Sequence, residues 1–122
     1  MNIKNVIKDS IQTKQLLLDD DALLERIKRA ADAVVSCYRA DGKVLLCGNG
    51  GSAADAQHIA AEFTGRFYYD RPPLFAEALH VNTSYVTAVA NDYSYDEIYA
   101  RYVMAAGKRG DVFVGLSTSG NS

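Results

Sequence analysis

The sequence predicts an α/β fold with a parallel sheet, because short apolar runs alternate with stretches of helical periodicity. Three runs have the length and the glycine- or proline-rich boundaries of buried strands, at residues 43–47, 74–79 and 111–116. Parallel strands need long crossover connections, so we expect helices to cover the faces of the sheet. A chain of 122 residues has room for one such domain.

Two helices are expected before the first strand. Residues 3–17 carry their apolar side chains roughly on one stripe, and the acidic run at 19–21 places negative charge at the start of a second helix. Apolar residues then recur at alternating steps of three and four, at Leu24, Ile27, Ala31, Val34 and Tyr38. This seam suits a core-facing stripe or a helix shared between subunits. We expect residues 1–40 to form a helical oligomerisation segment and residues 41–122 to form the domain.

Composition and charge exclude several classes of protein. The net charge of −2 implies no basic face, so nucleic acid is not an expected partner. No apolar run approaches about 18 residues, and no signal-peptide core follows the first lysines, so we expect no membrane partner. Cys37 and Cys47 form neither a disulfide framework nor a metal-spaced pair, which favours a reducing, cytoplasmic setting.

A glycine-rich loop at residues 48–52 follows the first strand and opens a helix over 53–64. Glycines let a ligand approach the backbone, and free amides at the start of a helix attract an anion or a hydroxyl. We expect Ser52 to cap this helix, with Asp55 completing a capping box. The spacing also matches a dinucleotide fingerprint, but the second strand ends without the required acid. A tight turn with no ligand is the alternative.

His58 and Glu62 lie four residues apart and therefore share one face of that helix. An imidazole and a carboxylate can bind a divalent metal, and the carboxylate can act as a general base. The same spacing also occurs in surface hydrogen bonds. Two ligands do not complete a zinc site, so any metal needs partners from elsewhere.

Two further polar segments follow predicted elements. The loop at residues 117–122 follows the carboxyl end of the third strand, where open α/β sheets bind ligands, and its hydroxyls and amides suit a phosphate. It contains no lysine, so it is no P-loop, and a solvated turn is the alternative. Asn91 and Asp92 end a short helix, and alone they indicate only helix termination. A second capping box, starting at Ser94, predicts a further helix that stops near Gly107.

The third strand is followed by a loop and no further element. A buried parallel strand normally needs a covering helix on each face. We therefore expect this chain to be the N-terminal part of a longer protein.

Together, residues 47–58, 61–66, 90–93 and 110–122 resemble the phosphoheptose isomerase family of sugar isomerase (SIS) domain proteins. The resemblance implies a doubly wound parallel sheet of the SIS type, here truncated after its third strand. It also implies isomerisation of sedoheptulose 7-phosphate to D-glycero-D-manno-heptose 7-phosphate through an enediol(ate), supplying heptose for lipopolysaccharide or capsule. The family is usually tetrameric, with its N-terminal helices in the interface.

The resemblance also implies roles for individual residues. Glu62 would be the general base, and His58 and Glu62 would be two ligands of one zinc ion per subunit. The substrate-binding residues implied are Asn49, Gly50, Gly51, Ser52, Glu62, Asn91, Asp92, Ser117, Thr118, Ser119 and Ser122. Family members continue into a second half with a Gln and a His that supply the other zinc ligands and the second acid/base. We therefore expect the chain alone to be inactive.

Non-catalytic SIS-domain proteins are the alternative. The DnaA initiator-associating protein resembles the chain at residues 10–13 and at Asn91 and Asp92, but it lacks a carboxylate at the position of Glu62. A regulatory sensor of sugar phosphates is a related possibility. The presence of Glu62 favours the enzyme, because a proton shuttle needs its base.

Overall fold

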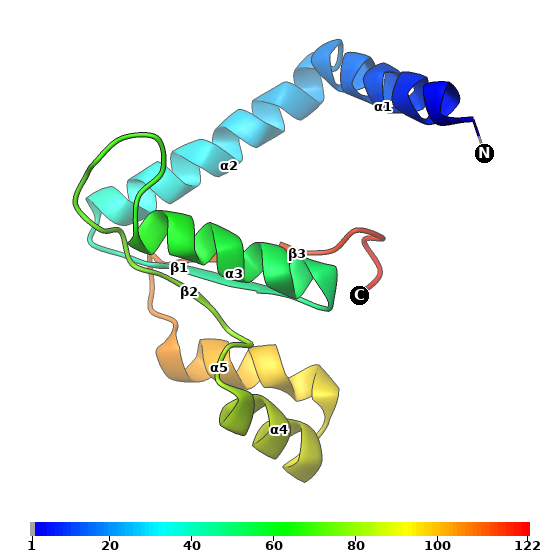
Figure 1. Cartoon of the computed structure of the whole chain (residues 1–122). Coiled ribbons are helices and arrows are strands. Elements are labelled where there is room, and N and C mark those ends of the chain that lie inside the picture. The colour runs from blue at the N-terminus through cyan, green and yellow to red at the C-terminus, as the bar shows by residue number, and fades with distance from the viewer. Residues whose placement is uncertain (1) are drawn as a thin grey trace. The chain divides into compact units, whose positions relative to one another are not determined.

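A computed structural model describes residues 2–122 and confirms the α/β class, with one parallel sheet and helices on both of its faces. The chain divides into two compact units, one ending at Val35 and the other covering Ser36–Ser122. Figure 1 labels the helices and strands in both units. No helix in the described part of the chain has both the length and the apolar character needed to cross a membrane.

The first unit is helical, as predicted. Helix α1 covers Ile3–Leu18, and the Asn2 side chain caps it by accepting a bond from the Lys4 amide. Helix α2 covers Asp21–Arg39, and Asp20 Oδ1 accepts from the Leu23 amide at 2.9 Å, so the acidic run does start this helix. The apolar side chains of both helices are exposed over most of their length. The final turn of α2 belongs to the second unit, where Tyr38 packs against Phe63 with ring centroids 5.5 Å apart.

The sheet has the strand order β2-β1-β3, and both pairings are parallel. Its strands are β1 (Val44–Gly48), β2 (Ala76–Ala78) and β3 (Val112–Leu116). Strand β2 is shorter than the predicted 74–79. The Leu74 amide donates to the Phe63 carbonyl instead of joining the sheet, whereas the Phe75 carbonyl and the Leu79 amide still bond to β1 at the ends of the strand. Strand β1 lies in the centre, and its five residues are all buried.

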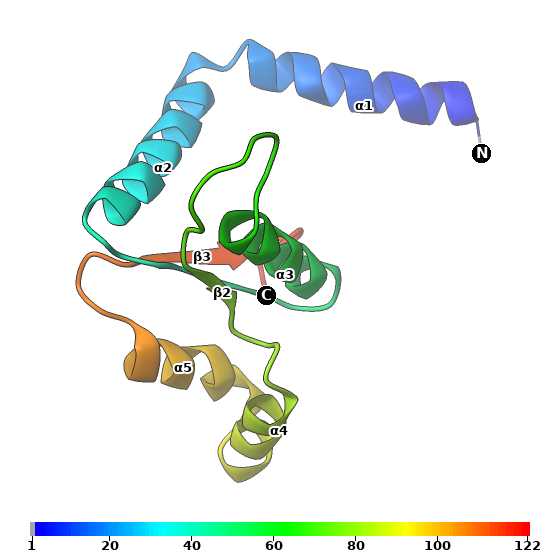
Figure 2. The same cartoon turned by 60° about the vertical axis from the view of Figure 1, so that its left-hand side comes forward.

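The side chains of β1 alternate between two helical layers. Leu45 and Cys47 pack with residues of α5 (Ile98–Ala106), whereas Gly48 faces α3 (Gly51–Thr64). Both views show α3 on one side of the sheet and α4 (Thr83–Asp92) and α5 on the other (Figure 1 and Figure 2). The doubly wound arrangement of the prediction is therefore confirmed.

Two predicted helix caps are wrong. Helix α3 begins at Gly51 with Gly50 as its N-cap, at φ 57°, so Ser52 lies within the first turn and no side chain caps the helix. Because Gly50 adopts a positive φ, the chain turns into the helix at that residue, and Ser52 follows the N-cap instead of occupying it. Ser94 likewise makes no capping bond, and a short 3₁₀ helix, η1 (Tyr95–Glu97), leads into α5.

The amino ends of β1 and β3 are joined by a salt bridge. Lys43 Nζ lies 2.5 Å from Asp111 Oδ2, and the same carboxylate accepts from the backbone amides of Lys43 and Lys108. These contacts, first among them the bond from the Lys43 side chain, lower the pKa of Asp111 to about 2. The carboxylate side chain is largely shielded from solvent.

This pair predicts a loss of stability in acid. Because the folded pKa of Asp111 lies below its ordinary value, its contribution is complete above about pH 4 and is lost as the pH falls toward 2. Urea unfolding at pH 6 and pH 3 should show a smaller acid-induced drop in midpoint for Asp111→Asn than for the wild type. Asp32→Asn, which removes an exposed partner of Lys28, is the matched control and should follow the wild type. Equal drops in all three proteins would contradict the prediction.

Candidate sugar-phosphate site

The glycine loop and the terminal polar loop lie side by side at the carboxyl edge of the sheet. Gly48 is paired with Leu116, so Asn49 and Ser117 leave neighbouring strands at the same level. The chain moves from β1 to β2 on one side and to β3 on the other, which makes this edge a topological switch point. A hollow of about 400 Å³ opens there, lined by Cys47, Gly48, Asn49, Tyr95, Asp96, Tyr99, Gly115, Leu116, Ser117 and Ser122.

Two tyrosines from the other layer hold the glycine loop. Tyr99 Oη donates to the Gly48 carbonyl at 2.6 Å, and Tyr95 Oη donates to Asn49 Oδ1 at 2.9 Å. Burial, followed by the neighbouring Tyr95, raises the pKa of Tyr99 to about 12, so its hydroxyl stays protonated at neutral pH. Tyr95, Asp96 and Tyr99 are not among the site residues predicted from the sequence, because they are distant in the chain and no local pattern joins them to the loop.

The terminal loop folds back on itself through its own hydroxyls. Ser117 Oγ accepts from the Gly120 amide at 2.9 Å, and Ser119 Oγ accepts from the Asn121 amide at 3.2 Å. A hydroxyl that accepts a bond still has its proton to donate. The loop therefore presents neutral donors next to the hollow, which suits an anion such as a phosphate.

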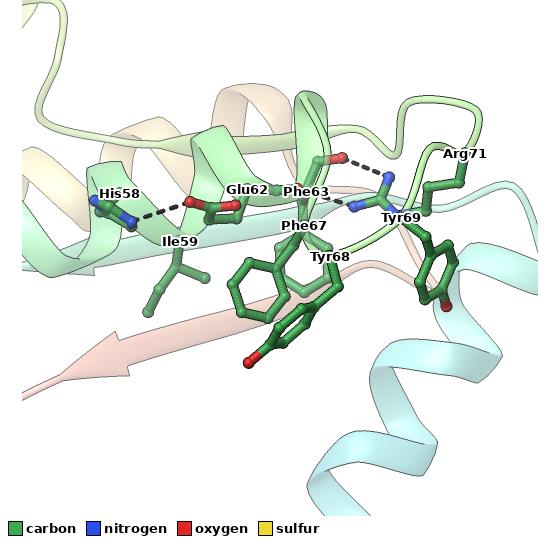
Figure 3. Close-up of a pocket in the computed structure, with 8 residues that line it drawn as sticks. All are labelled: His58, Ile59, Glu62, Phe63, Phe67, Tyr68, Tyr69 and Arg71. Carbon is green, nitrogen blue, oxygen red and sulfur yellow. Dashed lines mark hydrogen bonds and ion pairs between the residues drawn. The ribbon is translucent and has the colours of Figure 1, made fainter.

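Glu62 and His58 lie at a second hollow, of about 490 Å³. Figure 3 shows the residues that line it, which are His58, Ile59, Glu62, Phe63, Phe67, Tyr68, Tyr69 and Arg71. Glu62 Oε1 lies 3.1 Å from His58 Nε2, and the Glu62 side chain is 36% exposed. None of the residues lining this hollow also lines the first one. The structure thus separates the predicted base from Asn49 and Ser117 within one chain.

Arg71, which is not among the site residues predicted from the sequence, holds the following loop against the end of α3. Its guanidinium donates to the carbonyl oxygens of Glu62 and Phe63, each at 2.9 Å (Figure 3). Between α3 and Arg71 the chain turns sharply at Tyr68, which has a φ of 61°. These contacts hold the two ends of the loop together, and the exposed aromatic rings of this loop line the second hollow.

The other predicted substrate residues lie elsewhere. Asn91 and Asp92 end α4 on the exposed surface, where Asn91 Nδ2 donates to Asp92 Oδ1 at 3.0 Å, and neither lines the two hollows. Gly50 and Gly51 have open space where a side chain would start, so a ligand can reach this part of the loop.

His58 and Glu62 fit half of a zinc site. Tetrahedral zinc with bonds of about 2.0–2.2 Å places neighbouring donor atoms roughly 3.3–3.6 Å apart, so the two side chains, now 3.1 Å apart, need to separate only slightly to hold it. Among the residues that the structure describes, no group of three or more His, Cys, Asp or Glu gathers to hold a metal. The two donors suit the ion, and a complete zinc site would need further ligands from outside this set of residues.

Comparison with known proteins agrees with this architecture. The family model of the SIS domain matches residues 11–122. Phosphoheptose isomerase 2 of Campylobacter jejuni is 53% identical over 98% of the chain, and the phosphoheptose isomerase of Clostridium acetobutylicum is 54% identical over the same share. The chain spans 60% and 61% of the length of these two relatives.

Solved structures show the same similarity. Phosphoheptose isomerase GmhA from Neisseria gonorrhoeae superposes with a TM-score of 0.87 at 47% identity. A phosphoheptose isomerase from Francisella tularensis gives 0.89 at 41% identity. Each match covers 98% of this chain and 61% or 62% of the other. With its family model, its relatives and its sheet in agreement, this chain belongs to the SIS domain family.

Proposed function

We propose that the chain carries the sugar-phosphate site of a phosphoheptose isomerase, which interconverts sedoheptulose 7-phosphate and D-glycero-D-manno-heptose 7-phosphate. The observation that carries the proposal is the pairing of the Asn49 loop with the Ser117 loop at the switch point of the sheet. Both loops offer neutral hydrogen-bond donors to one hollow, as a phosphorylated polyol requires. The similarity to phosphoheptose isomerases over 98% of the chain supports this choice of substrate.

In this proposal the hydroxyls of Ser117, Thr118, Ser119 and Ser122 donate to the phosphate. Backbone amides of the glycine loop, including that of Ser52, and the side chain of Asn49 contact the sugar. Asn91 and Asp92, which line neither hollow of this chain, would contact it once another copy or further residues complete the site. Glu62 removes a proton from one of the two carbons C1 and C2 and returns it to the other, so an enediol(ate) forms between the two steps. His58 and Glu62 would hold zinc together with ligands from outside the described residues, and the ion would stabilise negative charge on a sugar oxygen.

The separation of the two hollows supports an oligomeric site. Within one chain, Glu62 and Asn49 line different hollows, so one substrate would meet both only if another copy or further residues complete the site. Exposed apolar residues run along α1 and α2, among them Ile7, Ile11 and Ile27. We propose that residues 1–40 use this surface for homo-oligomerisation, with a tetramer as the expected state, and that residues 41–122 are part of the SIS domain.

The cellular role follows from the reaction. The heptose phosphate would enter lipopolysaccharide or capsule synthesis, and the enzyme would act in the cytoplasm, where sugar phosphates are made.

Deuterium exchange tests the proposed reaction. The protein made from the uninterrupted reading frame, supplied with zinc, should introduce deuterium in heavy water at C1 of sedoheptulose 7-phosphate and at C2 of the heptose 7-phosphate product, as followed by proton NMR. The 122-residue chain, assayed in parallel, should show no exchange. A folded, oligomeric protein that binds the sugar phosphate without exchange would instead favour the non-catalytic reading, that of a binding protein or a sensor.

A further inference from the structure

The side-chain amide of Asn49 is held by one particular tyrosine. Tyr95 and Tyr99 both approach Asn49 Oδ1, at 2.9 Å and 3.5 Å. A phenol has one proton to donate, and Tyr99 gives its proton to the Gly48 carbonyl at 2.6 Å. Tyr95 is therefore the residue that donates to Asn49 Oδ1.

This bond determines which end of the amide a ligand meets. A carboxamide has an accepting oxygen and a donating NH₂ group at opposite ends. With Oδ1 engaged by Tyr95, the Nδ2 group is the end left for a ligand, and within residues 2–122 it donates to no other side chain. Asn49 lines the hollow that Ser117 and Ser122 also line.

We propose that Tyr95 is a positioning residue that orients the Asn49 amide so that Nδ2 donates to an oxygen of the bound sugar phosphate. The inference rests on the proposed function and deepens it, because it assigns Asn49 the role of a donor and not an acceptor. The ligand group it selects is an oxygen with free lone pairs, such as a sugar hydroxyl or a carbonyl oxygen. A carboxylate at position 49 would reverse that polarity.

Tyr95 lies on the surface, so its positioning role can be tested without removing a side chain that packs in the core. Tyr95 lies in the short helix η1 and is 54% exposed, whereas Tyr99 packs against the buried Leu45 and Cys47. Removing the Tyr95 hydroxyl therefore deletes its exposed bond to Asn49, together with its contact to the Tyr99 hydroxyl, and takes no ring out of the core. Tyr93 is a matched control, because it is also exposed and its ring, not its hydroxyl, contacts Arg101 at 4.1 Å.

The test combines a spectroscopic readout with ligand affinity, using the protein from the uninterrupted reading frame. In the ligand-free, ¹⁵N-labelled protein, Tyr95→Phe should shift the Asn49 side-chain amide resonances, whereas Tyr93→Phe should leave them in place. Titration with sedoheptulose 7-phosphate should show about fivefold weaker binding for Tyr95→Phe, the size expected for one net hydrogen bond. Asn49→Asp should lose more affinity for the sugar phosphate than Tyr95→Phe, because it replaces a hydrogen-bond donor with a negative charge near a phosphate.

Each outcome bears on a separate part of the inference. Unchanged Asn49 resonances in Tyr95→Phe would overturn the positioning role, and shifted resonances with wild-type affinity would overturn the donor role. A wild-type protein that binds the sugar phosphate through Asn49 but never exchanges deuterium would contradict the proposed isomerase and leave the Tyr95 inference standing. A wild-type protein that does not bind it would overturn both.

Discussion

Replacing Glu62 with glutamine should reduce deuterium exchange at C1 of sedoheptulose 7-phosphate and at C2 of its aldose product by roughly 10²–10⁴-fold, the usual contribution of a general base. Glutamine has almost the same shape, and its amide can still bond His58, which lies 3.1 Å from the carboxylate. The Glu62 side chain is partly exposed, so no buried charge is left unpaired by the change. We therefore expect the fold to be kept and the exchange to be lost.

The matched control is Glu25→Gln, which removes a carboxylate from the exposed surface of α2. It should exchange deuterium at the wild-type rate. Affinity for the sugar phosphate, measured by calorimetry, should change by no more than a few-fold in Glu62→Gln if the phosphate loop is intact. Exchange within about threefold of the wild type in Glu62→Gln would show that another group moves the proton.

The second large effect is expected at Gly48, where β1 passes closest to the start of α3. A methyl group added at Gly48 would lie 2.6 Å from the backbone carbon and oxygen of Ser52. Backbone atoms cannot rotate away as a flexible side chain can, so Gly48→Ala must displace the first turn of α3. We expect the free energy of unfolding, measured with urea, to fall by about 1–3 kcal/mol, the usual cost of overpacking.

Gly115→Ala is the control, because Gly115 lies on the neighbouring strand, opposite Cys47, and has nothing within 4 Å of the added carbon. This change should be neutral or slightly stabilising, because alanine lowers the entropy of the unfolded chain. Both variants must be compared at one protein concentration, since association would raise the apparent stability. Equal midpoints for the two variants would mean that α3 moves aside at little cost.

Local patterns in the sequence determined the elements and their order. The run 43–47 predicted β1 almost to the residue, because a central parallel strand is buried on both faces and reads as a continuous apolar segment. The step pattern of residues 24–38 predicted α2, and the acidic run marked its start. The sequence also predicted that the loops after β1 and β3 lie together, because the carboxyl ends of parallel strands meet at one edge.

Only the tertiary structure decided which side chains meet at those loops. Tyr95 and Tyr99 reach the glycine loop across 46 and 51 residues of sequence, and Arg71 reaches back to the end of α3. Periodicity says which face of an element is apolar, but it does not say which distant hydroxyl lies opposite a given carbonyl. That depends on strand order and helix placement. The resemblance implies one substrate site for Glu62 and Asn49, and the tertiary structure adds that within one chain they line different hollows.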